Sequence, residues 1–162
     1  MSVNRHRPHV WVLPEDDANR QLAIEFLVEV DSYLQAGVLQ PAGGWTKVLE
    51  TFKSVHVVEM QKYPDRFMVL LIDSDDDIGR IAYVKTEIPG HLAERVFILG
   101  ALSEPEDLER AGLGSYDDIG AKMAKDCRED TDTIGGHELL RHNARELDRL
   151  LQDVRPILFP SI

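Results

Sequence analysis

The chain has 162 residues, of which 43% are hydrophobic, and a chain of this length can bury roughly two-thirds of its unfolded surface in a single core. Its formal net charge of −11 argues against broad affinity for nucleic acid, because that affinity comes from Lys and Arg side chains that displace counterions. No apolar run reaches the roughly 20 residues of a membrane span, and the N-terminal residues lack the apolar core of a signal peptide. The single cysteine, Cys127, allows neither an internal disulfide nor a thiolate zinc site. We expect a soluble cytoplasmic protein without membrane contact.

The first two-thirds of the chain alternate predicted strands and helices. Apolar runs bounded by turn residues predict the strands, and apolar residues repeated every three or four positions predict the helices. The predicted elements are strand 9–13, a helix that buries Leu22, Phe26, Val30 and Leu34 and ends near Gly37, strand 38–40, a helix that buries Trp45, Val48, Leu49 and Phe52, strand 67–72, a helix over 78–88 stopped by Pro89, and strand 96–99.

The last third is predicted to be helical. Ser103 and Glu106 have the spacing of a capping box, Ser115 resembles a second helix start, and a last helix is predicted from about His137 to Val154. No linker divides the chain, so we predict a single domain over 1–162. Its fold class is α/β, a three-layer Rossmann-like sandwich with a mostly parallel sheet of about four strands and a helical C-terminal part.

Four aspartates follow the most apolar predicted strand. The run 67–72 shows no alternation, which is typical of a parallel strand buried on both faces, and Asp73, Asp75, Asp76 and Asp77 come directly after it. The carboxyl edge of an open α/β sheet is where ligands bind. Crowded carboxylates repel one another, which raises a pKa or calls for a cation. With oxygen ligands alone, that cation is expected to be Mg²⁺ or Mn²⁺.

Two further features fall at the same predicted edge. Glu15 follows the first strand, and Gly43–Gly44 follows the second. Glycines allow the backbone to approach a phosphate, and the next helix would point its N-terminus at it. Each feature also has a structural interpretation: Glu15 as a first-turn acid, Asp77 as the N-cap of the next helix, and Gly43–Gly44 as a simple turn.

The order of these features resembles the Toprim domain of topoisomerases, bacterial primases and small nucleases, over about residues 8–105, with the helical extension at about 106–155. The resemblance implies Glu15 as general acid/base and Asp73 and Asp75 as Mg²⁺ ligands, with Asp77 as a possible third. It also implies a phosphodiester-cleaving enzyme, most simply a nuclease acting on DNA or RNA. The chain departs from the family in having Pro14-Glu15-Asp16 where a Gly commonly follows the strand, and almost no room for a domain that grips nucleic acid.

The best candidate for local contact with a phosphate backbone is a basic stripe on the last predicted helix. Arg141, Arg145 and Arg149 recur every four residues, although such a stripe usually pairs with nearby acids. A partner protein or a homodimer would be a second source of binding surface.

Two other functions fit the same pattern. A receiver-like phosphoacceptor module also has acids after its first strand, an aspartate after its third, here Asp73, and a hydroxyl after its fourth, here Ser103. Such modules need a lysine after a fifth strand, which the sequence does not predict. The other alternative is a catalytically silent Toprim fold used for protein association.

Overall fold

Four strands form one parallel sheet, as the sequence predicts. The computed structural model describes residues 3–160, apart from the side chains of Tyr33 and Ile78. Its sheet has the order β2-β1-β3-β4, and each neighbouring pair is parallel. The strands are β1 (His9–Pro14), β2 (Ala36–Val38), β3 (Arg66–Leu71) and β4 (Val96–Leu99). The central pair, β1 and β3, is in register with Val12 opposite Val69.

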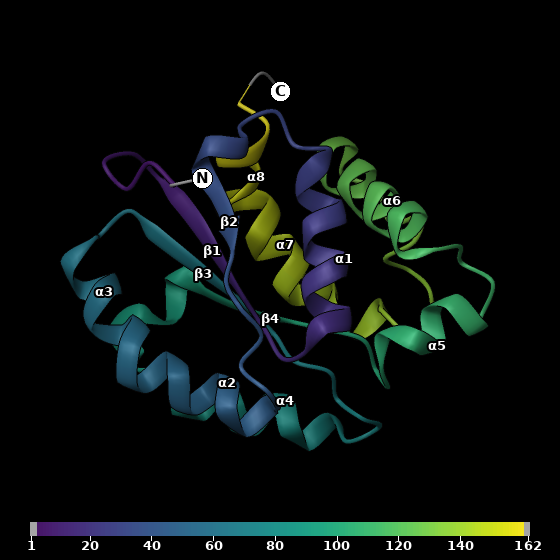
Figure 1. The fold of residues 1–162 in the computed structure, drawn as a ribbon, viewed down its shortest axis with the longest axis horizontal. Coiled ribbons are helices and arrows are strands. Elements are labelled where there is room, and N and C mark those ends of the chain that lie inside the picture. Colours follow the sequence, from purple (N-terminus) through teal and green to yellow (C-terminus); the bar gives the residue numbers. More distant parts are fainter. Residues whose placement is uncertain (1–2, 161–162) are drawn as a thin grey trace.

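Helices cover both faces of the sheet, which makes the fold a three-layer α/β sandwich of Rossmann-like type. Figure 1 shows α1, α6, α7 and α8 on one side of the strands and α2, α3 and α4 on the other. The helices are α1 (Asp17–Val28), η1 (Tyr33–Gln35), α2 (Trp45–Thr51), the π-helix η2 (Phe52–His56), α3 (Val57–Lys62), α4 (Ile78–Glu87), η3 (Gly90–Arg95), α5 (Pro105–Arg110), α6 (Tyr116–Glu129), η4 (Arg141–Asn143), α7 (Ala144–Asp153) and α8 (Arg155–Leu158). Within residues 3–160, none of them is both long and apolar enough to cross a membrane.

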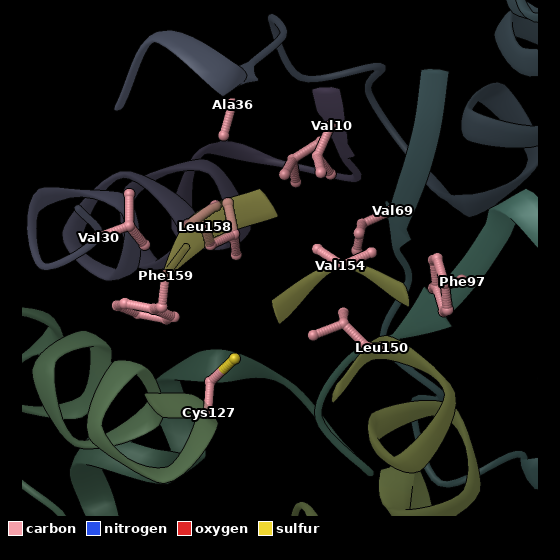
Figure 2. Packing of buried hydrophobic residues seen from close by; sticks show 12 residues of the cluster. Val10, Val30, Ala36, Val69, Phe97, Cys127, Leu150, Val154, Leu158 and Phe159 are labelled. Carbon is pink, nitrogen blue, oxygen red and sulfur yellow. The ribbon is translucent and has the colours of Figure 1, made fainter. Parts of the chain in front are cut away.

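The strand β3 contributes to two apolar cores, because successive side chains of a strand point to opposite faces. Val69 belongs to the core beneath α1, α6 and α7, part of which is drawn in Figure 2. Met68 and Leu70 belong to the core beneath α2, α3 and α4, together with the fully buried Phe52. The prediction of a strand buried on both faces is therefore confirmed.

The first helix and the second strand differ from the prediction in their boundaries. The helix α1 ends at Val28, so that Leu34 lies in η1 with 46% of its surface exposed instead of on a buried helix face. The N–H groups of Asp31 and Ser32 donate to the carbonyl of Leu158, at 3.1 and 3.2 Å. The C-terminal segment thus fixes where this connection turns. The strand β2 occupies 36–38 instead of 38–40, paired with 10–12 of β1.

The predicted helix from His137 was too long at its start. Residues 137–140 form turns, in which the N–H of Leu139 donates to His137 Nδ1 and the carbonyl of Leu139 accepts from Leu102 N at 2.8 Å. Leu102 lies beyond β4, and Asn143 N donates to the carbonyl of Leu140 instead of that of Leu139, so α7 begins only at Ala144.

The two predicted helix starts after β4 had opposite outcomes. The capping box at Ser103 was wrong: the N-cap of α5 is Glu104, without a side-chain cap bond, and the carbonyl of Ser103 accepts instead from Asp75 N. The start at Ser115 is confirmed, because Ser115 and Asp118 cap each other's backbone N–H groups at the start of α6.

The outer edge of β4 is covered by side chains. Glu146 on α7 accepts a hydrogen bond from Ile98 N at 2.9 Å, and Asn143 both accepts from Gly100 N and donates to the carbonyl of Gly100. Arg149 donates to the carbonyl of Val96. These three residues, spaced three apart, bond to the edge of β4 where a fifth strand would pair, which protects an edge that is otherwise open to other chains.

A close helix crossing on the opposite flank gives a stability prediction. A Cβ atom at Gly120 on α6 would lie 2.6 Å from Glu25 Cβ and 2.9 Å from Phe26 N on α1. Alanine at this site gains about 1 kcal/mol of helix propensity but overpacks the crossing, which costs about 1–3 kcal/mol. We expect Gly120→Ala to lower the free energy of unfolding by about 1 kcal/mol in urea.

The matched control for this substitution is Gly90→Ala, because a Cβ at Gly90 meets nothing within 4 Å. It should leave the urea midpoint nearly unchanged. Equal stability of the two variants would mean that α1 and α6 do not cross this closely.

Candidate functional site

The candidate site lies at the point of the sheet where the connections between strands change from one face to the other. The strand β1 connects to its neighbour β2 through α1 on one face, whereas β3 connects to β4 through α4 on the other face. Because β1 and β3 are adjacent, the connections that follow them diverge to opposite faces at their carboxyl ends. Ligands of open α/β sheets bind at such a switch point. Glu15 and Asp73 are the first carboxylates after these two strands.

The structure brings Glu15 and Asp73 together, as the parallel pairing predicts. Glu15 N continues the ladder by donating to the carbonyl of Leu71 at 3.0 Å, and Glu15 Oε2 accepts from Asp73 N at 2.9 Å. Burial raises the pKa of Glu15; the hydrogen bond from Asp73 N opposes this increase, and nearby Asp16 adds to it. A raised pKa makes this carboxyl group better suited to accepting and returning a proton.

Asp73 points into the protein rather than toward solvent. Only 5% of its surface is exposed. Its Oδ1 accepts from Ala101 N and its Oδ2 from Asn19 Nδ2, both at 2.9 Å. Burial raises the pKa of Asp73 to about 7, against the hydrogen bonds from Asn19 and Ala101 and with a contribution from the charge of Glu15. This carboxylate is therefore the most strongly perturbed acid of the candidate site.

The other aspartates of the loop are held in separate places. Asp75 and Asp76 have φ values of 49° and 60°, a left-handed conformation that Asp tolerates better than most residues, and both are exposed. Asp77 is the N-cap of α4 and accepts from Gly79 N at 3.1 Å. The structural interpretation of Asp77 thus holds.

These positions limit how a metal ion could be held. In the described range 3–160, no three His, Cys, Asp or Glu side chains gather in an arrangement that could hold a metal ion. The carboxylates of Glu15 and Asp73, with Asp75 nearby on the same loop, fit Mg²⁺ in ligand type. Mg²⁺ in proteins is commonly bound through one or two carboxylates and keeps several waters.

Gly43 and Gly44 lie directly beside Glu15. Their φ values of 99° and 143° are in the range that favours glycine. Both of their N–H groups donate to the carbonyl of Glu15, at 2.9 and 3.2 Å. The glycine turn therefore positions Glu15, and its N–H groups are already occupied. Other groups nearby would have to contact a phosphate. The side chain of Lys47 packs beside this turn, with its Cδ 3.7 Å from where a Cβ atom on Gly43 would be.

Sequence reasoning missed the side chains that support and flank the carboxylates. Arg80, on the first turn of α4, donates to the carbonyl of Asp73 at 2.9 Å, lies 3.9 Å from Asp75 Oδ2, and stacks 5.0 Å from the ring centroid of Trp45. Trp45 in turn contacts Tyr83 edge to face at 6.1 Å, and Tyr83 is 49% exposed. The sequence could have indicated Arg80, because it lies three residues after Asp77, the N-cap of α4. A side chain in the first turn of that helix lies close to the end of the preceding strand, β3. Asn19 has the same spacing from Asp16, which caps α1.

The predicted arginine stripe does not form one face of a helix. Arg141 lies in η4 before α7 begins. Arg149 is directed at the sheet edge, where it donates to the carbonyls of Ala93 and Val96 and to Glu146. Arg145 is exposed on α7. Their contact with nucleic acid stays a prediction, and of the three, Arg149 already has partners in the fold.

Fold and site together define a Rossmann-like α/β protein with a carboxylate pair at the switch point of its sheet. Comparison of the chain with protein-family models, with curated proteins and with solved structures found no match. The Toprim resemblance accordingly stays a prediction from the residues.

Proposed function

We propose that the protein is a Mg²⁺-dependent phosphodiester-cleaving enzyme of Toprim type, a nuclease that acts on DNA or RNA either alone or within a complex. The observation that carries this proposal is the direct contact of Glu15 with Asp73 at the switch point of the sheet. The charge of the whole chain, −11, requires that the contact with nucleic acid be local.

In this proposal the residues have separate roles. Glu15 moves the proton of the attacking group, for which its raised pKa is suited. Asp73 and Asp75 hold Mg²⁺, while Asp77 would have to give up its capping bond to join them. When bound, Mg²⁺ or Mn²⁺ supplies positive charge that neutralises the phosphoryl oxygens. Arg80 fixes the backbone of Asp73 and adds a second positive charge beside Asp75.

The flank formed by Trp45, Arg80 and Tyr83 supports a nucleic acid over other phosphate esters. The exposed ring of Tyr83 offers a surface on which a base can stack, and the neighbouring cations can meet phosphates. Lys47, whose side chain packs beside Gly43, is a further candidate for a phosphate contact. A partner protein, a second copy of the chain, or Arg141 and Arg145 would have to supply further grip.

The receiver alternative has one observation in its favour. Receiver-like modules share the strand order 2-1-3-4-5, and the order β2-β1-β3-β4 matches its first four strands. Against this alternative, Asn143 and Glu146 occupy the edge of β4 where the fifth strand would pair. Asp73 is also buried, with both carboxylate oxygens bonded, so that phosphorylation, like the proposed metal binding, would require one of these hydrogen bonds to open.

The proposal is tested by incubating the purified protein with single- and double-stranded DNA and RNA in Mg²⁺ or Mn²⁺. We expect cleavage that falls at least about 100-fold in Glu15→Gln, the usual loss when a positioned acid or base is removed, and that also falls in Asp73→Asn, which removes a proposed metal ligand. The exposed substitution Asp130→Asn serves as the control and should cleave like the wild type. Equal cleavage by all variants would show that the activity arises elsewhere.

Metal binding should be measured beside cleavage, because it separates the remaining outcomes. Calorimetric binding of Mn²⁺ that is weakened by Asp75→Asn, without cleavage by the wild type, would indicate a working site that needs a partner. No metal binding at all would favour the catalytically silent, protein-associating fold.

A further inference from the structure

Positive charge gathers at the amino edge of the sheet, the edge opposite to the candidate site. Three cationic groups lie over the ring of Tyr63, just before β3. Their distances from the ring centroid are 5.4 Å for Arg5 Cζ, 5.5 Å for Lys62 Nζ and 4.9 Å for Arg66 Cζ. Arg5 also donates to the hydroxyl of Tyr63 at 3.0 Å. These four residues, here called the Tyr63 cluster, concentrate positive charge in a chain whose net charge is −11.

Arg66 is held in place by a buried histidine. Only 7% of the surface of Arg66 is exposed, and His9 is fully buried. Arg66 Nε donates to His9 Nε2 at 3.0 Å, and His9 Nδ1 lies 2.8 Å from the carbonyl of Arg7. Because a guanidinium group can only donate, His9 Nε2 accepts, and the ring proton is on Nδ1, which donates to Arg7. A neutral His9 therefore orients the guanidinium group.

The turn that carries Tyr63 and Arg66 is also fixed by the protein. Arg95 donates to the carbonyls of Met60, Tyr63 and Arg66, at 3.0, 3.2 and 2.8 Å. The backbone around Tyr63 is thus ordered before a ligand arrives, which lowers the entropy that binding would cost. Both terminal nitrogens of Arg95 have partners in the fold, so Arg95 supports the cluster and is not part of it.

The terminal nitrogens of Arg66 keep donors for a ligand. A guanidinium group has five N–H donors in all, and within residues 3–160 the hydrogen bond of this side chain is the one from Nε to His9. Glu59 Oε2 lies 3.8 Å from Arg66 Nη1, which is longer than a hydrogen bond. Because 8% of the Arg66 side chain is exposed, an anion can approach these nitrogens from solvent.

The neighbouring acids do not neutralise the cluster. Glu59 supplies one negative charge against three cations, and the cluster stays positive even when the exposed Asp65 is counted. Burial lowers the pKa of Arg66; Glu59 opposes this decrease, and the positive charge of Arg5 adds to it. An anion with more than one negative charge would relieve this repulsion.

A terminal phosphate group has the matching chemistry. It carries about 1.5–2 negative charges at pH 7 and three strong acceptor oxygens, whereas a carboxylate carries one charge. The planar guanidinium group of Arg66 can bind two phosphate oxygens at once. Cations already lie over the ring of Tyr63, and its hydroxyl already accepts from Arg5. Recognition therefore falls on the phosphate and not on a stacked base.

We propose that the Tyr63 cluster binds one terminal phosphate group, with Arg66 as the fixed ligand and the exposed Arg5 and Lys62 contacting the remaining oxygens. The inference is independent of the nuclease proposal, because the cluster lies at the opposite end of β1 from Glu15, roughly 20 Å away along the strand. A free phosphate or small phosphate ester and the end of a nucleic acid strand share this chemistry, and the test distinguishes the two sources.

The test is a titration of the purified full chain with inorganic phosphate at constant ionic strength. The chain is labelled with ¹⁵N, and NMR follows the Nε–H of Arg66 together with the backbone amides of Tyr63 and Arg66. We expect these signals to shift and saturate with one phosphate per chain, and to stay in place when acetate replaces phosphate. The absence of a saturable shift would overturn the proposal.

Two variants locate the binding. The double variant Arg5→Gln/Lys62→Gln changes exposed residues only, so it should fold like the wild type and bind phosphate at least about tenfold more weakly. Arg66→Lys keeps the charge but loses the planar fork, and we expect a loss of at least about tenfold there too. The control Lys125→Gln removes an exposed charge on α6 and should bind like the wild type. Unchanged affinity in the double variant would contradict the assignment, whether or not Arg66→Lys folds.

The source of the phosphate is read from an oligonucleotide with a 5′-phosphate and its counterpart with a 5′-hydroxyl, both tested without divalent metal so that no cleavage occurs. Tighter binding of the phosphorylated strand, displaced by inorganic phosphate, would indicate the end of a nucleic acid. Binding of inorganic phosphate with no preference for that strand would indicate a free phosphate or a small ester. Equal binding of both strands that phosphate does not displace would overturn the proposal, because recognition would then lie in the backbone.

Discussion

Replacing Asp73 with asparagine is expected to stabilise the protein relative to the wild type increasingly as the pH rises from 4 to 8. The pKa of Asp73 rises from an ordinary 3.8 to about 7 on folding, chiefly because of burial. Below pH 3.8 the carboxyl group is protonated in both states. Between that pH and about 7 the unfolded chain releases the proton and the folded chain keeps it, so each pH unit favours unfolding by about 1.4 kcal/mol.

The total cost reaches roughly 4 kcal/mol above pH 7 and then stays constant. The asparagine side chain carries no charge and avoids this cost, although its amide group would face the donor amide of Asn19 and lose about 1–2 kcal/mol at every pH. The measurement is urea unfolding of both proteins from pH 4 to pH 8. The difference between them should shift by roughly 4 kcal/mol in favour of the variant.

The difference between variant and wild type is the informative quantity, because other groups titrate in the same range. Burial also raises the pKa of Glu15, whereas hydrogen bonds outweigh burial at Asp126 and lower its pKa. The exposed substitution Asp130→Asn is the matched control, because it removes the same charge at an exposed position. A difference for Asp73→Asn that does not change with pH would show that the Asp73 carboxyl group is not buried in the folded protein.

Removing the Glu146 side chain is expected to cost about 2–4 kcal/mol of unfolding free energy, because Glu146→Ala leaves Ile98 N without its acceptor and separates two charges from their partner. Glu146 is 5% exposed, accepts from Ile98 N, and pairs with Lys85 at 2.8 Å and Arg149 at 2.9 Å. Lys85 and Arg149 are 46% and 37% exposed in their side chains, so water can solvate them and the lost backbone bond dominates. Urea unfolding at pH 7 measures the loss.

Glu146→Gln separates the two contributions. Its amide oxygen can still accept from Ile98 N, while the charge is lost, and we expect a loss of about 1 kcal/mol or less. Light scattering adds a second reading, since an uncovered edge of β4 should favour association between chains. If Ala and Gln at this position destabilise the protein equally, the charge rather than the covered edge is what matters.

The burial of Asp73 has a consequence for function. The charged carboxylate of Asp73 lowers the stability of the fold at neutral pH. Functional sites commonly contain residues that lower stability but are required for activity. Under the proposed function, we expect Asp73→Asn to be the more stable protein at pH 8 and to lack the cleavage activity. A bound divalent cation would favour the ionised form and reduce the same cost.

The sequence by itself determined most of the sheet and the edge at which Glu15 and Asp73 lie. The runs 9–13, 67–72 and 96–99 form strands because each is apolar enough to require burial, whereas β2 lies at Ala36–Val38 and not at the predicted 38–40. Alternation of strands with helices then makes the sheet parallel. Parallel strands end at one edge, and this alone predicted that Glu15 and Asp73 would be neighbours.

Only the tertiary structure decided what each side chain at that edge does. Asp73 is held by residues 54 and 28 positions away, the edge of β4 is covered by residues of a later helix, and α1 ends where the C-terminal segment meets it. None of these partners is visible in a local pattern, because hydrogen bonds between distant segments depend on how the layers pack.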